Sequence, residues 1–557
     1  EMALAWFLRL YQAGEVDGLY FALPTRAAAT QMHQRVVRFA ESSFGSEAPE
    51  VILAVPGYFS PVSRGIQSDG NRFASTQSND RAWAAEHPKR YLAGKLVVGT
   101  VDQILLSGLA VRHSHLRAAA LLRHLLVVDE VHASDAYMTR ILQHVLKRHL
   151  NAGGHALLLS ATLGEEARLR LLRPDRLMDP DRPEKAESRP YPALWTGGLS
   201  SETPPAPRSI APHGSDKEIS LTLESSMTSP EEVAQLASRA VDCGARVGIL
   251  RNTVGDAVAT QRALEEMCDR ACLFVCAGHP APHHGRFARE DRALLDRELE
   301  RQLHGNGPLA VAATQTIEQS LDIDFDLLIT DLCPIDVLIQ RLGRLHRHER
   351  HRPDAYSRPQ VHVLQPEKEL SEFLGMDGYA RGPGGLGSVY PDLAILDATR
   401  EVLAQRESLC LPSENRVLIE TALHPAKLRE LCESAGGAWM VHWTTMWGED
   451  STQRAVGDLN VVDWEQPLSQ TRFTRSEKKI PTRLGEDQRR LPFPETVAGP
   501  FAQPVTELCL PGWMARGISE DPHVAIRNDS EGLIITADSR SFLYNRFGIQ
   551  ATGSSYD

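Results

Sequence analysis

One short stretch constrains the fold of this chain more than any other. The apolar run Leu125-Leu126-Val127-Val128 leads straight into two adjacent carboxylates, Asp129 and Glu130. A continuous apolar run followed by polar sequence is typical of a central parallel strand buried on both faces. In open α/β sheets the chemistry lies just beyond the carboxyl ends of such strands, and paired carboxylates there suit phosphoryl chemistry. Asp129 can hold Mg²⁺ through its water shell while Glu130 orients or deprotonates the attacking water; the alternative is a strand that ends on two solvated acids.

The composition is that of a soluble globular protein with three or four domains. The 557 residues are 42% hydrophobic and 24% charged, and no apolar run approaches the ~20 residues of a membrane span, so we expect no membrane contact. The eight scattered cysteines indicate a reducing compartment. The net charge of −12 excludes a uniformly basic nucleic-acid-binding coat but leaves room for a local basic groove.

Three other predicted strands in the first third of the chain also end on polar residues. The strand at 18–23 is followed by Thr25 and Arg26 at the start of a helix, where free N–H groups and an arginine can meet a phosphate; an ordinary turn and helix cap is the alternative. Thr100 follows the strand that begins at Leu96, and its hydroxyl can bond a phosphate oxygen. The strand from His155 ends on two hydroxyls, Ser160 and Thr162, which can sense the Asp129 and Glu130 site.

Changes in composition divide the rest of the chain. Residues 56–95 are predicted to form a surface insertion, and 181–220 have the Pro, Ser and charge content of an interdomain linker. We expect a first α/β domain over 1–180, a second over 221–365, a helical linker region over 366–480 and a small accessory domain over 481–557.

A basic octet, Gln340 to Arg347, is the second strong signal. Arg341, Arg344 and Arg347 are three residues apart, so a helix would place them along one face. Such a face can reach a nucleotide held by the other domain and stabilise charge on a transferred phosphoryl group. A solvated basic helix face is the alternative.

The order of these motifs resembles a superfamily 2 helicase with two RecA-like lobes and, more narrowly, the CRISPR-associated helicase–nuclease of type I systems. The resemblance rests on residues 20–31, Val127 to Asp135 and Ala313 to Asp326, and covers about 1–365. It implies an α/β fold of two parallel-sheet lobes in tandem, then a helical linker and a small C-terminal domain.

The resemblance also implies function. It implies ATP-driven translocation, with ATP and Mg²⁺, along single-stranded DNA marked by the RNA-guided CRISPR surveillance complex in the prokaryotic cytoplasm. Its residue roles are catalysis for Asp129, Glu130, Arg344 and Arg347; metal binding for Asp129; coupling of ATP state to DNA grip for His132, Ser160 and Thr162; nucleotide binding for Asp322, Gln340 and Gly343; and DNA contact for Thr25, Arg26, Thr100, Arg251 and Thr316.

Two departures from the family pattern lead to further expectations. The phosphate-binding loop G-x-x-x-x-G-K-[ST] does not occur, and none of the 21 histidines is followed by Asp, the pair that marks the family's HD nuclease. We therefore expect a fragment that is inactive alone and lacks a mid-sheet strand of its first lobe, with the nuclease in missing sequence or on another protein. The alternatives are a different superfamily 2 helicase acting on RNA or repair DNA, and an ATP-dead subunit that only binds nucleic acid or a partner.

Overall fold

The chain forms two compact units that alternate along the sequence. The computed structural model describes residues 1–55, 91–133, 135–175, 178–198, 206–211, 214–305, 307–318, 321–467, 470–471, 473 and 489–552. Most of the predicted insertion at 56–95 lies outside these residues. Unit 1 comprises Glu1–Asp181, Leu194–Arg208 and Gly448–Leu484; unit 2 comprises Arg182–Ala193, Ser209–Trp447 and Gly485–Asp557.

Unit 1 is built on a five-stranded sheet with the order β2-β3-β1-β4-β5, in which every neighbouring pair is parallel. The strands are β1 (Gly18–Leu23), β2 (Val51–Ala54), β3 (Leu96–Thr100), β4 (His124–Val128) and β5 (His155–Leu158). The predicted central strand is confirmed, because β4 is buried at every position and lies between β1 and β5. The five strands form one continuous hydrogen-bonded sheet, and the expected absence of a further strand stays a prediction. Strand β5 is a half-buried edge strand rather than a fully buried one.

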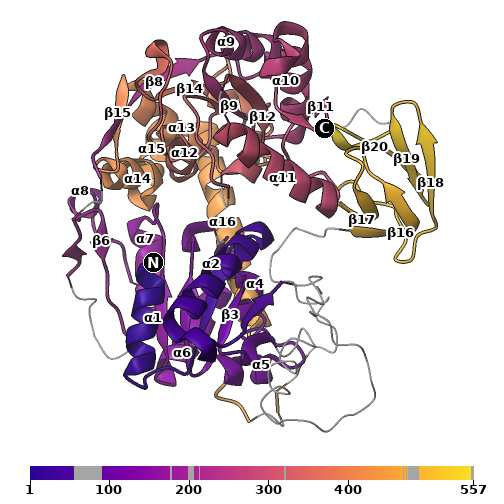
Figure 1. The fold of residues 1–557 in the computed structure, drawn as a ribbon. Coiled ribbons are helices and arrows are strands. Elements are labelled where there is room, and N and C mark those ends of the chain that lie inside the picture. The colour runs from indigo at the N-terminus through magenta and orange to yellow at the C-terminus, as the bar shows by residue number, and fades with distance from the viewer. Residues whose placement is uncertain are drawn as a thin grey trace. The chain divides into compact units, whose positions relative to one another are not determined.

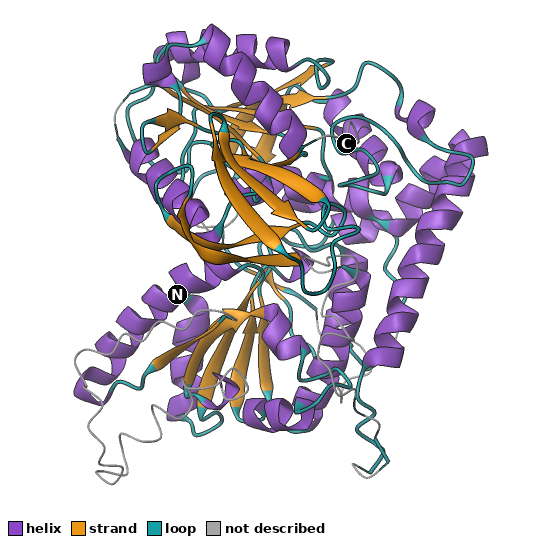
Figure 2. Ribbon diagram, turned by 90° about the vertical axis from the view of Figure 1, so that its right-hand side faces the viewer, coloured by secondary structure: helices purple, strands orange, loops and turns teal. Residues whose placement is uncertain are grey.

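The alternation of side chains along β1 and β4 explains why helices cover both faces of this sheet (Figure 2). Phe21 and Val127 point into one apolar cluster with α1 and α2, whereas Tyr20 and Leu126 point into another with α4 and α6. The helices are α1 (Met2–Gln12), α2 (Arg26–Phe44), α4 (Val101–Leu105), α5 (Ser114–Leu121), α6 (Ala136–Asn151) and α7 (Glu165–Leu172), with 3-10 turns η1 (Gly45–Glu47), η2 (Tyr91–Ala93) and η3 (Val131–Ala133).

Unit 2 contains a six-stranded sheet with the order β12-β9-β13-β14-β8-β15. The first five strands are parallel, and β15 joins the edge antiparallel to β8. The strands are β8 (Lys217–Glu224), β9 (Arg246–Leu250), β12 (Leu309–Ala313), β13 (Leu327–Asp331), β14 (Gln360–Leu364) and β15 (Ser408–Leu411). The expected second domain at 221–365 is therefore too short at both ends, since β8 begins inside the predicted linker and β15 lies beyond residue 365.

The remaining elements of this unit surround the sheet (Figure 1). Helices α9 and α10 pack against each other and against the sheet, and α13 packs against α14 and β8. Helices are α8 (Pro183–Glu187), α9 (Pro230–Asp242), α10 (Val254–Met267), α11 (Arg289–His304), α12 (Ile335–Leu342), α13 (Leu393–Ala404), α14 (Asn415–Leu423) and α15 (Pro425–Ala435); 3-10 turns are η4 (Arg270–Cys272), η5 (Gln315–Ile317), η6 (Asp354–Tyr356) and η7 (Leu370–Phe373); short strands are β10 (Val275–Cys276) and β11 (His279–Pro280). The two-residue strands β6 (Ala193–Leu194) and β7 (Arg208–Ser209) lie where the chain passes from one unit to the other.

The C-terminal strands, yellow in Figure 1, form a small β domain that packs on unit 2's α/β core. The Tyr544 hydroxyl donates to Asp291 Oδ2 at 2.5 Å and accepts from the Ala288 amide at 2.9 Å, and Arg546 pairs with Glu265 on α10 at 2.6 Å. This domain contains a pair, β16 (Arg489–Ala498) with β17 (Pro504–Leu510), and a meander of β18 (Val524–Asp529), β19 (Gly532–Ala537), β20 (Arg540–Asn545) and β21 (Gly548–Ala551).

The region 366–480, expected to be a helical linker, is divided between the units. Its long helix α16 (Gly437–Asn460) belongs to unit 2 as far as Trp447, and from Gly448 on the helix and the residues after it belong to unit 1. Asn460 donates to the Tyr137 hydroxyl at 3.2 Å, Asp458 pairs with Arg140 at 2.7 Å, and Trp464 lies under the Arg148 guanidinium. Within the described part of the chain, no helix combines the length and apolar character that crossing a membrane requires.

The first prediction concerns the core of unit 1. Leu126→Ala should lower the local free energy of unfolding by about 2–5 kcal/mol, because it leaves a cavity under a fully buried strand. Leu116, 49% exposed on α5, supplies the control Leu116→Ala, which should change little. Native-state hydrogen exchange of the β1 and β4 amides measures both effects. Equal protection in the two variants would contradict the central position of β4.

Candidate functional site

The two carboxylates emerge at the carboxyl end of β4, as the sequence predicts. The Asp129 amide donates to the carbonyl of Ala22 at 2.9 Å, which extends the pairing with β1, and Asp129 Oδ1 accepts from the Glu130 amide at 3.1 Å. Burial, and next the charge of Glu130, raise the pKa of the Asp129 carboxyl to about 6. Oxygen ligands are those Mg²⁺ prefers, so this pair fits the expected metal: Asp129 would bind it, with Glu130 beside it.

The residues expected to couple nucleotide and nucleic acid lie next to this pair. His132 Nδ1 lies 2.8 Å from Ser160 Oγ and 3.6 Å from Glu130 Oε2. The Thr162 amide donates to Ser160 Oγ at 3.3 Å, whereas Thr162 Oγ1 is buried without a hydrogen-bond partner in the described residues. A continuous chain of contacts therefore runs from Glu130 through His132 to the segment after β5.

Glu130 adopts a backbone conformation that is uncommon for a residue with a side chain. Its φ of 51° lies in the left-handed region, which costs of order 1–3 kcal/mol unless the surroundings impose it. The neighbouring pairings of Asp129 with Ala22 and of the Val131 amide with the Leu159 carbonyl hold both flanks of this residue. Such strain clusters at functional sites.

Three expected DNA contacts of unit 1 follow adjacent strands. Thr25 is exposed and caps α2, because its hydroxyl accepts from the Ala28 amide at 3.2 Å, and Arg26 is exposed at the first position of that helix. Thr100 pairs with Leu23 across β3 and β1, but its side chain is buried. The structure thus brings these residues to one edge of the sheet and presents Thr25 and Arg26 to solvent; their role stays a prediction.

Arg251 differs from its expected role as a DNA contact. Its side chain is fully buried, its Nε lies 2.9 Å from Asp331 Oδ1, and its other nitrogens donate to Thr260 Oγ1 and the Met227 carbonyl. The guanidinium therefore joins β9 to the end of β13 and is not presented to a phosphate in this structure. A strand-end arginine looks the same in sequence whether it faces solvent or a buried carboxylate.

Thr316 lies in η5 beside a buried polar group that the sequence did not indicate. Its hydroxyl lies 3.0 Å from His283 Nδ1, and His283 Nε2 lies 3.0 Å from Asp296 Oδ1. Arg292 donates to the Thr316 carbonyl at 3.3 Å. Burial, and next Arg292, lower the pKa of His283 to about 4, so this histidine is neutral near pH 7 and holds Thr316 by hydrogen bonding.

The basic octet does not form one helical face. Helix α12 ends at Leu342, and the segment that follows pairs with the residues before β13: the Phe325 amide donates to the Arg344 carbonyl, and the His346 amide to the Phe325 carbonyl. The non-local pairing overrides the helical spacing. The predicted common face of Arg341, Arg344 and Arg347 is therefore wrong.

The three arginines have separate environments. Arg341 is fully buried and bonds Glu318, Thr330 and Asn252. Arg344 is almost buried and donates to the carbonyls of Glu318 and Leu321 at 2.5 and 2.6 Å. Arg347 is exposed, with its Nε 3.3 Å from Asp322 Oδ1. Asp322 is also exposed, Gln340 is half-buried in the last turn of α12, and Gly343 follows that turn.

Sequence reasoning missed two residues of this region. Asp331 is the last residue of β13 (Leu327–Asp331), and Asn252 joins Arg341 to the carbonyls of Leu332 and Gly384. The strand-end rule that located Asp129 would have located Asp331. Nothing local marks Asn252, since its partners are 63 or more residues away.

Comparisons with known proteins show which family this chain resembles. A family model described as the C-terminal part of the CRISPR-associated nuclease/helicase Cas3 matches residues 243–350. The CRISPR-associated endonuclease/helicase Cas3 of Escherichia coli (strain K12) is 32% identical over 451 residues, covering 77% of this chain and 47% of that protein. The protein of the same name from Thermus thermophilus is 33% identical over 457 residues, covering 72% and 46%.

Solved structures agree on the fold. The crystal structure of T. fusca Cas3 with AMPPNP superposes with a TM-score of 0.71 at 22% identity, covering 96% of this chain and 65% of that one. A chain from the structure of a CRISPR RNA-guided surveillance complex in a pre-nicking state gives 0.62 at 21% identity, covering 99% and 70%.

The fold and the comparisons define the class first: tandem RecA-like α/β lobes of a superfamily 2 helicase. Within that class the chain is Cas3-like, and the resemblance predicted from the sequence is confirmed. The chain spans about half the length of the curated relatives it matches.

The second prediction tests the role of Arg251. Arg251→Ala should lower the stability of unit 2 by about 3–5 kcal/mol, because it leaves Asp331 charged, buried and without its ion pair. Denaturant unfolding followed by hydrogen exchange of β9 and β13 measures the loss. Arg358→Ala, at an exposed position, is the control. A stable Arg251→Ala protein with weakened DNA binding would instead restore Arg251 to the DNA track.

Proposed function

We propose that this chain forms the ATP-driven motor of a type I CRISPR interference protein, which moves along single-stranded DNA marked by the RNA-guided surveillance complex. The observation that carries this proposal is the contact chain from Asp129 and Glu130 through His132 to Ser160 at the carboxyl ends of β4 and β5. The named activities of the Cas3 relatives, endonuclease and helicase, support the same class of function.

In this proposal each of the site residues in unit 1 has a separate role. Asp129 would hold Mg²⁺, which would neutralise charge on the phosphates of ATP, and Glu130 would orient the attacking water. His132 lies between Glu130 and Ser160, so a change in the carboxylate's partner alters the hydrogen bond to Ser160 and Thr162. This change in hydrogen bonding would transmit the state of the bound nucleotide to the loop that follows β5.

The residues of unit 2 supply the second half of the machinery. Arg344 and Arg347 stabilise charge on the transferred phosphoryl group, while Asp322, Gln340 and Gly343 bind the nucleotide. Arg344 must then exchange its bonds to the carbonyls of Glu318 and Leu321 for phosphate oxygens. Thr316, held by His283, contacts the DNA backbone together with Thr25 and Arg26.

The cellular setting belongs to the proposal as well. All eight cysteines are free thiols, as expected for the reducing prokaryotic cytoplasm. An HD nuclease, in further sequence or on a separate protein, would cut the DNA that the motor delivers.

The third prediction addresses hydrolysis. In a protein that joins this chain to a phosphate-binding loop, Glu130→Gln should lower DNA-stimulated ATP hydrolysis by a factor on the order of 10²–10⁴ with ATP binding preserved, because the positioned base is lost. Glu41→Gln, at an exposed position on α2, should leave turnover unchanged. Phosphate release is measured with DNA and, separately, with RNA. Near-normal turnover in Glu130→Gln would remove Glu130 from the mechanism, and stronger stimulation by RNA would favour a different superfamily 2 helicase.

The fourth prediction addresses the DNA track. Affinity for single-stranded DNA should fall as salt rises, and Arg26→Ala should reduce the slope of that dependence by about 1, because one phosphate contact no longer releases a counterion. Arg38→Ala removes an exposed charge from the same helix, so it controls for net charge. Fluorescence anisotropy at several salt concentrations gives both slopes. Identical slopes for the two variants would place Arg26 away from the DNA.

A further inference from the structure

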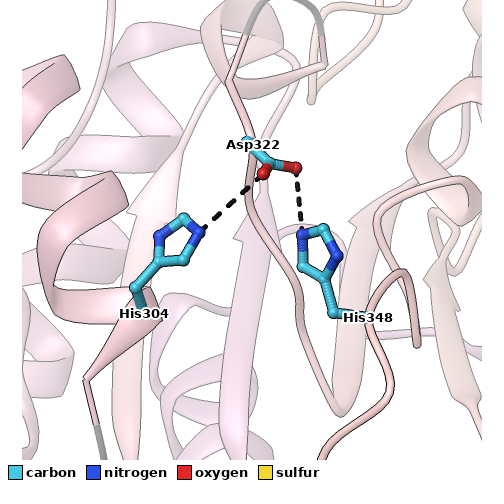
Figure 3. A group of neighbouring side chains, drawn as sticks. All are labelled: His304, Asp322 and His348. Carbon is cyan, nitrogen blue, oxygen red and sulfur yellow. Dashed lines mark hydrogen bonds and ion pairs between the residues drawn. The ribbon is translucent and has the colours of Figure 1, made fainter.

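Three side chains from separate segments converge on the surface of unit 2 (Figure 3). His304 is the last residue of α11, Asp322 precedes β13, and His348 follows the basic octet. His348 Nε2 lies 2.9 Å from Asp322 Oδ1, and His304 Nε2 lies 3.8 Å from Asp322 Oδ2. One nitrogen or oxygen atom from each residue lies within 4.8 Å of the other two.

The fold fixes this convergence rather than leaving it to flexible side chains. Leu321 and Ile323 are buried, so Asp322 between them faces outward. Glu300 on α11 then holds two of the three residues: its Oε1 accepts from the Asp322 amide at 3.0 Å, and its carbonyl lies 2.7 Å from His304 Nδ1.

The bond to the Glu300 carbonyl determines the chemistry of His304. A carbonyl only accepts, so Nδ1 carries the proton and Nε2 of the neutral ring carries the lone pair. That lone pair faces a carboxylate oxygen, which is also an acceptor. Two acceptors that face each other repel, and either a proton or a metal ion between them removes that repulsion. A histidine whose second nitrogen donates to a backbone carbonyl is also the usual arrangement of a metal ligand.

We propose that His304, Asp322 and His348 bind a divalent transition-metal ion, with Zn²⁺ as the best fit. Tetrahedral Zn²⁺ with bonds of about 2.0–2.2 Å sets its ligand atoms roughly 3.3–3.6 Å apart. The two imidazole nitrogens lie 2.9 and 3.8 Å from different oxygens of Asp322, and one ligand atom of each residue lies within 4.8 Å of the other two, so small side-chain rotations bring all three to that spacing. Two imidazoles and one carboxylate select Zn²⁺ over Mg²⁺, which prefers oxygen ligands. The protein supplies three ligands, so a fourth position stays open to water or an anion.

Occupancy of this site has a structural consequence for Arg347. Its Nε lies 3.3 Å from the Asp322 oxygen that also faces His348, so the guanidinium and the metal ion compete for one carboxylate. Zn²⁺ binding releases Arg347 from Asp322. Metal binding itself does not depend on the proposed motor function and is measured without ATP or DNA.

The test is calorimetric titration of the 557-residue chain with ZnCl₂, supported by native mass spectrometry to count bound ions. His304→Ala and His348→Ala should each weaken the affinity of one site at least about tenfold. His351→Ala, an exposed histidine three residues after His348, is the matched control and should bind like the parent. Arg347→Gln should bind more tightly than the parent, because the competing cation is gone.

Two results would overturn the proposal. If the parent chain binds no Zn²⁺, or if the His304 and His348 variants retain the parent's affinity and stoichiometry, the three residues do not form a metal site. An unchanged affinity in Arg347→Gln would overturn the competition for Asp322. Titration with Co²⁺, whose absorption reports tetrahedral nitrogen and oxygen ligands, follows the site directly, and far-UV circular dichroism of each variant shows whether its fold is retained.

Discussion

The buried ion pair between Arg251 and Asp331 is the interaction on which the carboxyl edge of the second sheet depends. Asp331 also accepts from the Asn252 amide at 2.8 Å, and Asn252 Oδ1 accepts from Arg341. Arg341 in turn fixes Glu318, whose carbonyl binds Arg344. One buried carboxylate thus organises, through a chain of satisfied donors, the segments that carry Thr316 and Arg344. A partly satisfied network of this kind would cost more than an apolar core, which explains why its polar members are so thoroughly paired.

Much of the first lobe could be predicted from sequence because its signals are local. The apolar run before Asp129 specifies a buried parallel strand, and strand ends in a parallel sheet share an edge, so Thr25, Thr100 and Ser160 were placed at the correct edge without coordinates. The positions of Arg344 and Arg347 could not be predicted from the local sequence. Their spacing does not produce a helix, because the Arg344 carbonyl accepts from the Phe325 amide and the Arg347 amide donates to Asp324 Oδ1. Arg350 and Arg352 pair with Asp324 and Asp326 and reinforce this arrangement.

Domain boundaries were the least predictable feature, and the reason is again non-local. Strand β8 starts within a stretch rich in proline and charge, and its partners β14 and β15 come about 140 and 190 residues later. The chain passes from unit 2 to unit 1 at Gly448, within the helix α16, so no loop marks that boundary. Nothing in a local window distinguishes Arg251, which faces a buried carboxylate, from Arg26, which faces solvent.

The alternation of the two units along the sequence bears on how the protein is made. The last structural segment of unit 1 begins at Gly448, about 270 residues after Asp181. At roughly 5–20 residues per second, a ribosome needs on the order of 13–50 s to cover that distance. During this interval the nascent first lobe exposes the surface that receives Asn460 and Trp464, while the second sheet closes first with β15. The second sheet is therefore complete before unit 1 receives its last segment, and unit 2 as a whole is complete only after Gly485–Asp557 has been made.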